Sequence, residues 1–313
     1  MKTLNTSRRN LLRSAAGLAG GLALVRREGP AAQEALPAPL PTVKLGKHET
    51  SRLIIGANPF GGYSHFNKLL DDHMREWMTE DRVVETLRRC EQSGINTWQF
   101  HYSPQTLAAL KRHRQEGGKL QFIVLSEGEL KRNLDLIPEV AKMKPVAIVH
   151  HGGVTDERFR AREMHKVEDY LKRVRDTGVM VGLSMHNPHV MEYVEEKGWD
   201  IDLYMTCFYR ISRTPEESRQ ACGGKLPLGE VFLEDDPAEM TKRVRQTRKP
   251  CLGFKILAAG RSINSPEQVE KAFQFAFSNI KASDAVIVGM YPRYKDEVKE
   301  NSDLTRRFGR RES

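Results

Sequence analysis

The chain has 313 residues, of which 39% are hydrophobic and 29% charged, and its formal net charge is +9. No apolar run reaches the roughly 18 residues that a membrane-spanning helix needs, so the mature chain should have no stable membrane span. Basic residues are scattered among acidic ones without an aromatic stripe, which argues against nucleic-acid binding. Four cysteines are too few for a disulfide scaffold; a bridge between Cys207 and Cys222 and four unlinked thiols both stay open.

Residues 1–35 are interpreted as a targeting segment and spacer. Ser7-Arg8-Arg9-Asn10-Leu11-Leu12-Arg13 precedes a weakly apolar Gly/Ala-rich stretch and then a Pro/Ala-rich spacer. This pattern resembles a twin-arginine signal of bacteria, whereas a basic tail or a signal-anchor is the alternative. The first interpretation makes the export machinery a partner and predicts a periplasmic or extracellular protein formed by residues 36–313.

From Val43 onward the sequence alternates between apolar runs and amphipathic segments. Residues 43–53 predict a β-hairpin around Gly46, and residues 58–77 and 211–235 are expected to be long loops. Strands are expected at residues 53–56, 96–100, 120–125, 146–149, in the apolar run from Gly178, and at residues 201–206, 252–256 and 285–288. Helices are expected at residues 79–94, 103–117, 130–143, 162–176 and 187–198, and after Pro237, Ser265 and Pro292.

Eight strand–helix units after a hairpin predict an α/β fold, a (β/α)8 TIM barrel with an N-terminal β-hairpin. The competing fold is an open doubly wound sheet. That fold usually has a Gly-rich phosphate loop after its first strand, and Gly56-Ala57-Asn58-Pro59-Phe60-Gly61 is a poor match. The closed barrel is therefore preferred.

Polar side chains follow several of the predicted strands. Three histidines and one carboxylate end four consecutive strands: His101, Glu127, His150 and His186. Neighbouring parallel strands lie about 4.8 Å apart, so these groups could meet and bind Zn, Mn or Fe. Alternatively, they hydrogen-bond substrate hydroxyls or loop backbone. Lys255 is a candidate Schiff-base or proton-transfer lysine if it is desolvated, and otherwise an ion-paired lysine.

Several stretches, taken in order, resemble aldo-keto reductases, in particular the branch fused to an iron–sulfur segment, although the cluster cysteines are absent. They are Leu45-Gly46 with Ile55-Gly56, Gly94-Ile95-Asn96, Val149-His150, Val181-Gly182-Leu183-Ser184-Met185-His186, Phe254-Lys255-Ile256-Leu257-Ala258-Ala259-Gly260 and Val288-Gly289-Met290. The resemblance spans about residues 43–301. It implies binding of NAD or NADP and reduction of a carbonyl by an Asp, Tyr, Lys and His set.

The family's residues carry over to this chain only in part. The resemblance places the catalytic His at His150 and the Tyr at Tyr102, with Gln99 in place of the Asp and Leu125 or Ser126 in place of the Lys. For the cofactor it assigns Ser184, Glu300 and Asn301. Glu297 stands where an Arg usually holds the 2′-phosphate, which favours NAD over NADP because a carboxylate repels that phosphate.

Three functions follow from these observations. The first is an exported oxidoreductase with a diverged catalytic set (His150, Tyr102 and Lys255) that acts on a small carbonyl or hydroxylated, sugar-like substrate. The second is a metal-dependent lyase, isomerase or hydrolase on the same barrel. The third is a non-catalytic binding protein for a small molecule.

Overall fold

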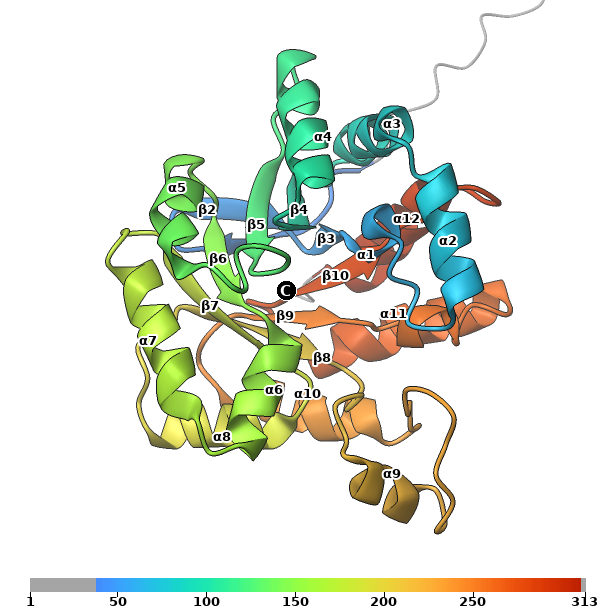
Figure 1. Cartoon of the computed structure of the whole chain (residues 1–313). Coiled ribbons are helices and arrows are strands. Elements are labelled where there is room, and N and C mark those ends of the chain that lie inside the picture. Colours follow the sequence, from blue (N-terminus) through green and yellow to red (C-terminus); the bar gives the residue numbers. More distant parts are fainter. Residues whose placement is uncertain (1–37, 311–313) are drawn as a thin grey trace, which may run out of the picture. The chain divides into compact units, whose positions relative to one another are not determined.

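The computed structural model describes residues 38–310, so the predicted targeting segment lies outside the described residues (Figure 1). Eight parallel strands close into a barrel in the order β10-β3-β4-β5-β6-β7-β8-β9. The predicted TIM barrel is therefore confirmed. Its strands are β3 (Leu53–Gly56), β4 (Thr97–His101), β5 (Gln121–Leu125), β6 (Ala147–His150), β7 (Met180–Met185), β8 (Leu203–Cys207), β9 (Cys251–Phe254) and β10 (Ala285–Gly289).

Eight helices that match the predicted ones surround the barrel. They are α3 (Glu80–Gln92), α4 (Pro104–Gln115), α5 (Ile137–Lys142), α7 (Met164–Arg175), α8 (Pro188–Glu196), α10 (Asp236–Gln246), α11 (Pro266–Asn279) and α12 (Glu297–Phe308). Side-chain caps fix several starts: Ser103, Asn187 and Ser265 each accept a hydrogen bond from a first-turn backbone N–H. The helix expected at 130–143 is shorter than predicted. Pro138, which lacks an N–H, lies in the first turn of α5 rather than inside a longer helix.

Four further helices were not predicted: α1 (Asn58–Gly61), α2 (Lys68–Trp77), α6 (Gly152–Arg160) and α9 (Pro215–Ala221). Two short 3₁₀ turns, η1 (Leu134–Leu136) and η2 (Ala258–Gly260), complete the set. The expectation of a loop over 58–77 was wrong, because Asn67 caps α2, a helix without a buried residue. The start of α6 was concealed by Gly152-Gly153, since glycine is a poor helix former.

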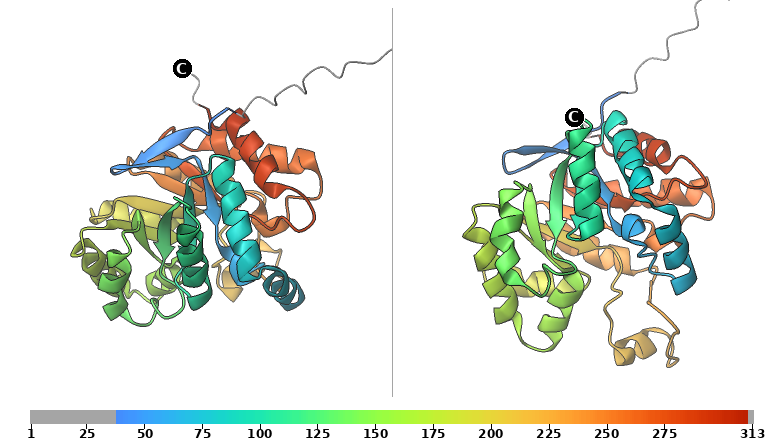
Figure 2. Two further views of the ribbon diagram at one scale, coloured as in Figure 1. Left: turned by 90° about the horizontal axis from the view of Figure 1, so that it is seen from above. Right: turned by 45° about the horizontal axis from the view of Figure 1, so that its top comes forward.

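The N-terminal hairpin closes one end of the barrel. Strands β1 (Thr42–Leu45) and β2 (His48–Ser51) pair antiparallel, and Val43 and Leu45 are buried among barrel-interior side chains. Figure 2 shows the hairpin and α9 at opposite ends of the barrel. The hairpin thus covers the N-terminal ends of the strands, and a binding site is expected at their C-terminal ends.

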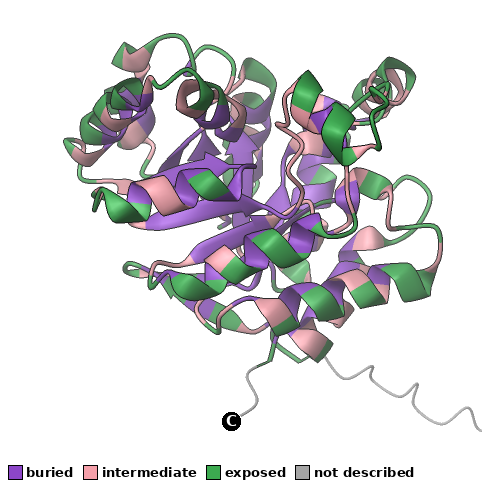
Figure 3. Ribbon diagram, turned by 90° about the horizontal axis from the view of Figure 1, so that it is seen from below, coloured by how far each residue is buried: buried purple, intermediate pink, exposed green. Residues whose placement is uncertain are grey.

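Two apolar cores follow from the alternation of side chains along the strands. The inner core fills the barrel with residues such as Ile123, Val149 and Met205. The outer core lies between the strands and the helices and contains Trp98, Leu183 and their neighbours. The strands are buried, and the outward faces of the helices are exposed (Figure 3). A strand residue's place in this alternation therefore decides whether it reaches the barrel interior.

All four cysteines, Cys90, Cys207, Cys222 and Cys251, are free thiols, so the alternative without a disulfide holds. Among residues 38–310 no helix combines the length and apolarity needed to cross a bilayer.

Candidate active site

A cavity of about 840 Å³ opens at the C-terminal ends of the strands, here called the mouth. Its size is within the range of small-molecule sites. Polar lining residues come from neighbouring strand ends and the loops that follow them: Gln99, His101, Glu127, His151, Ser184, His186, Glu230 and Lys255. Aromatic residues Tyr63, Phe66, Tyr291 and Tyr294 form much of its rim.

The floor of the cavity carries two buried polar side chains from β4. Gln99 and His101 lie two residues apart and line the cavity, whereas Trp98 and Phe100 between them belong to the outer core. The Gln99 Nε2 is buried and has no hydrogen-bond partner among residues 38–310. Burial lowers the pKa of His101 to about 4, so its imidazole is neutral at pH 7.

A carboxylate orients His186 at the end of β7. Asp156 on α6 is fully buried, and its carboxylate accepts hydrogen bonds from the His186 Nδ1 at 2.9 Å and the His186 backbone N–H at 3.0 Å. A third bond comes from the backbone N–H of Asn187 at 3.3 Å. Since a carboxylate only accepts, the Nδ1 carries the proton. Burial lowers the pKa of His186, although the charge of Asp156 acts in the opposite direction. The Nε2 therefore keeps its lone pair. No group within the described part of the chain forms a hydrogen bond with this nitrogen.

Glu127 and His151 form a second carboxylate–imidazole pair, between the loops after β5 and β6. The His151 Nε2 lies 2.6 Å from the Glu127 carboxylate. Burial raises the pKa of Glu127, but the hydrogen bond and charge of His151 outweigh it and hold that pKa at about 2. This pair forms part of the cavity wall.

Lys255 follows β9 in a strained conformation. Its φ of 58° lies in the left-handed region, as do those of Ala258 and Ala259 in the same loop. The Lys255 Nζ lies 5.1 Å from the centroid of the Phe254 ring. The centroid of the same ring lies 5.6 Å from that of the His186 ring. Burial lowers the pKa of Lys255, although Cys207 and Glu230 oppose this. No carboxylate within residues 38–310 forms an ion pair with this ammonium.

Three loops meet over the mouth. His65, after β3, pairs with Glu230 of the 211–235 insertion at 2.9 Å. Arg261, after β9, donates to the His65 backbone carbonyl at 2.9 Å and lies 3.9 Å from the centroid of the Phe232 ring. The segment around His65 and the 211–235 insertion therefore line the cavity together.

Two of the predicted catalytic residues lie elsewhere. His150 occupies the outward position of β6, where its Nδ1 is 2.7 Å from the Thr155 Oγ1 and its ring packs on Tyr170 at 4.8 Å. Tyr102 packs against the outer core. Neither lines the cavity, so His150 and His186 do not face the same hollow. The residue that reaches the cavity after β6 is His151. Burial of His150 against the helices lowers its pKa to about 3.

The predicted cofactor residues are divided as well. Ser184 lines the cavity, two residues before His186 on the same face of β7, and its hydroxyl has no partner among residues 38–310. Asn301 is buried on α12, and Glu300 pairs with Lys295 at 2.6 Å; neither lines the cavity. Glu297 does line it, and burial raises its pKa to about 7. The residues present thus fit one amide contact at Ser184, and not the adenosine contacts expected from Glu300 and Asn301.

The predicted metal ligands are not gathered into one cluster. His101, Glu127 and His186 line the cavity, but Glu127 pairs with His151 and His186 with Asp156, while His150 faces the helices. Within the described part of the chain, no group of three or more His, Cys, Asp or Glu side chains is arranged to hold a metal ion.

Comparison with known proteins identifies a shared fold only. No family model matches the chain, and no curated protein sequence matches it. Among solved structures it is similar to a truncated 3-deoxy-D-arabino-heptulosonate 7-phosphate synthase from Thermotoga maritima, with 16% identity and a TM-score of 0.48, over 86% of this chain and 91% of that one. It is also similar to the glycerol dehydrogenase AKR11B4 from Gluconobacter oxydans, with 11% identity and a TM-score of 0.44, over 87% of this chain and 97% of that one. A third similar structure is a Yersinia pestis DHPS, with 10% identity and a TM-score of 0.46, over 84% of this chain and 95% of that one. At these identities and TM-scores the similarities carry no functional argument, so function has to be argued from the site.

Proposed function

We propose that this chain is an enzyme that transfers protons on a small hydroxylated carbonyl compound bound in the barrel mouth. The observation that carries the proposal is the Asp156–His186 pair. A fully buried carboxylate fixes the imidazole tautomer so that the Nε2 lone pair is left for the cavity. This is the arrangement of a general base whose orientation is set by a third group.

The substrate class follows from the unpartnered polar groups. Ser184, His101 and the Gln99 amide line the same cavity as His186 and can hydrogen-bond hydroxyl or carbonyl oxygens. The exposed rings of Tyr63 and Phe66 offer flat apolar faces at the rim, as carbon-bound hydrogens of a polyol require.

In the proposed reaction the His186 Nε2 removes a proton from a substrate hydroxyl or from the carbon next to a carbonyl. Asp156 stabilises the imidazolium that forms, and the same nitrogen then returns the proton to the product. Lys255, whose Nζ lies against the same Phe254 ring as His186, supplies positive charge where the carbonyl oxygen becomes an oxyanion.

Hydrogen exchange tests this function directly. The purified protein is incubated in D2O with dihydroxyacetone, glyceraldehyde or a hexose, and deuterium at the carbon next to the carbonyl is followed by NMR. We expect exchange with the native protein and a loss of about 10²-fold or more in His186→Gln. A folded native protein that binds these compounds without exchanging or converting them would instead be a binding protein.

NAD-linked oxidoreduction of the same substrates is the second candidate. Ser184 favours it, since its unpartnered hydroxyl stands at the position that the family resemblance assigns to the nicotinamide amide. A bound nicotinamide would supply hydride chemistry, and His186 would then handle the proton. Mass spectrometry and an absorbance scan of protein isolated from its native compartment decide this candidate: stoichiometric nucleotide supports it, and nucleotide-free protein that still exchanges deuterium contradicts it.

We also propose that residues 1–35 direct export through the twin-arginine route. The support is the Arg8-Arg9 pair with its flanking residues. A reporter fused after residue 40 should reach the periplasm, and changing both arginines to lysine, which keeps the charge, should abolish this. Export of the lysine variant at an unchanged level would refute the proposal.

A further inference from the structure

We propose that Lys255 forms a covalent imine with the carbonyl carbon of the substrate. This inference rests on the proposed function, because it concerns the same cavity and the same class of substrate. Three features of the chain support it: the surroundings of the amine, the conformation of its backbone, and the proton-transferring group beside it.

The Lys255 amine lies against an aromatic ring and is not held in an ion pair. Its Nζ lies over the ring of Phe254, a side chain packed against the inner core, and no carboxylate forms an ion pair with it within residues 38–310. Lys295, which lines the same cavity, is instead paired with Glu300 at 2.6 Å. Of these two lysines, only Lys255 has the desolvated environment that makes an amine nucleophilic.

The backbone of Lys255 is held in a conformation that favours glycine. A φ of 58° costs a non-glycine residue on the order of 1 kcal/mol, and glycine would remove that cost. The Lys255 carbonyl accepts a hydrogen bond from the Ala258 N–H at 2.8 Å, which closes a tight turn after β9. Ala258 and Ala259 share this left-handed φ, so the strain belongs to the whole loop and fixes the backbone from which the Lys255 side chain enters the cavity.

The acid–base group that imine formation needs is His186, whose ring contacts the same Phe254 ring as the Lys255 Nζ. The Lys255 ammonium first gives one proton to the His186 Nε2, and the freed Nζ lone pair attacks the carbonyl carbon while the C=O π electrons move to oxygen. A proton passes from the nitrogen to that oxygen and produces a neutral carbinolamine. The His186 imidazolium then protonates the hydroxyl, which leaves as water while the C=N bond of the protonated imine forms. No oxidant or reductant is required, and the protonated imine draws electrons from the neighbouring C–H bond, which His186 then deprotonates.

Reductive trapping tests the proposal. The purified native protein is incubated with dihydroxyacetone or glyceraldehyde and sodium cyanoborohydride, and adducts are located by peptide mass mapping. We expect one reduced adduct per chain, at Lys255, formed at least tenfold faster than at Lys295. Equal labelling of both lysines, or no adduct at Lys255 with either compound, would overturn the proposal.

Two variants serve as matched controls. Lys255→Arg keeps the positive charge but has no nucleophilic amine, so it should give no rapid adduct, while Lys295→Arg should leave the Lys255 adduct unchanged. Lys255→Met replaces the arginine variant if that one fails to fold by circular dichroism. If Lys255→Arg keeps native deuterium exchange, imine formation is refuted while the proposed function stands. If the native protein shows neither exchange nor adduct, the proposed function fails with it.

Discussion

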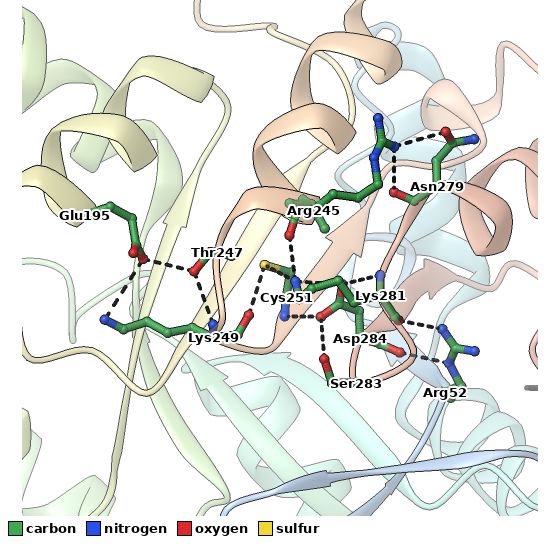
Figure 4. A network of polar contacts seen from close by, with 11 residues as sticks. Arg52, Glu195, Arg245, Thr247, Lys249, Cys251, Asn279, Lys281, Ser283 and Asp284 are labelled. Carbon is green, nitrogen blue, oxygen red and sulfur yellow. Dashed lines mark hydrogen bonds and ion pairs between the residues drawn. The ribbon is translucent and has the colours of Figure 1, made fainter.

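The two ends of the barrel differ in what the side chains of their main polar networks bind. At the N-terminal end, Asp284 accepts hydrogen bonds from the Cys251 N–H at 2.8 Å, the Lys281 N–H at 2.7 Å and the Lys281 Nζ at 3.0 Å (Figure 4). Arg52 donates to the carbonyls of Asp284 and Lys281 in the same network. Groups that are satisfied within the chain stabilise the fold.

At the mouth the corresponding groups are left without partners inside the described chain. The Gln99 amide, the Ser184 hydroxyl, the His186 Nε2 and the Lys255 amine all belong to residues that line one cavity. Of these groups the Gln99 Nε2 is fully buried, and a buried polar group without a partner costs about 1–3 kcal/mol, so we expect a ligand in the cavity to satisfy it. The contrast separates an end built for stability from an end built for binding and chemistry.

The largest effect should come from breaking the N-terminal network. Asp284→Ala removes the carboxylate that pairs with Lys281 and the acceptor of the Cys251 and Lys281 N–H groups, although the Lys281 Nζ keeps its bond to the Val244 carbonyl. We expect the free energy of unfolding to fall by about 3–5 kcal/mol. Urea denaturation measures this. Asp135→Ala, which removes an exposed carboxylate 3.4 Å from Arg173, is the control and should change stability by less than about 1 kcal/mol. Similar losses in both variants would mean that the network contributes little.

The next effect distinguishes two histidines at neighbouring strand ends. His186→Gln should lower turnover by about 10²–10⁴-fold because it removes the proposed base, whereas His150→Gln should leave turnover within about threefold of the native value. Both histidines are buried, so destabilisation alone should not separate them. Loss of turnover in His150→Gln with full activity in His186→Gln would restore the family's catalytic histidine and contradict this account.

Stability should depend on pH through the buried neutral imidazoles. Burial depresses the pKa of His101 to about 4 and of His150 to about 3, below the unfolded value near 6.5. Between these values the unfolded chain binds more protons, so the stabilisation is complete above about pH 6.5 and is lost as the pH falls toward 3. Each histidine should contribute a slope of up to about 1.4 kcal/mol per pH unit. His150→Gln should flatten the curve of unfolding free energy against pH, and an unchanged curve would contradict the assignment.

The smallest effect concerns the loops over the mouth. Arg261→Lys keeps the charge but loses the stacking on Phe232 and the fixed donor geometry toward the His65 carbonyl. We expect substrate affinity to fall by about 3–10-fold with little change in unfolding free energy. Unchanged affinity in this variant would show that the three loops act independently of binding.

The sequence was sufficient for the barrel because eight apolar runs alternate with amphipathic segments and a parallel sheet must close around them. It was not sufficient to orient His150. Strand β6 is buried on both faces, so its apolar pattern does not show which residues point inward, and His150 and His151 are adjacent. Because successive strand residues point to opposite faces, an error of one residue moves a side chain from the cavity to the layer of helices.

The partners of the site residues were missed for a different reason. Asp156 lies in Val154-Thr155-Asp156-Glu157-Arg158, which has the composition of a solvated helix, yet it is fully buried. Glu230 lies in an insertion without regular hydrophobic spacing. Both reach the mouth through tertiary contacts between distant segments, which local sequence patterns do not encode.

The most direct test of the account is ¹⁵N NMR of the histidine side chains during titration with dihydroxyacetone. We predict that His186 in the free protein carries its proton on Nδ1, and that its Nε2 resonance moves on ligand binding while those of His150 stay in place. An Nε2-protonated His186, or ligand-induced shifts at His150 without any at His186, would contradict the claim that the mouth is the active site and His186 its base.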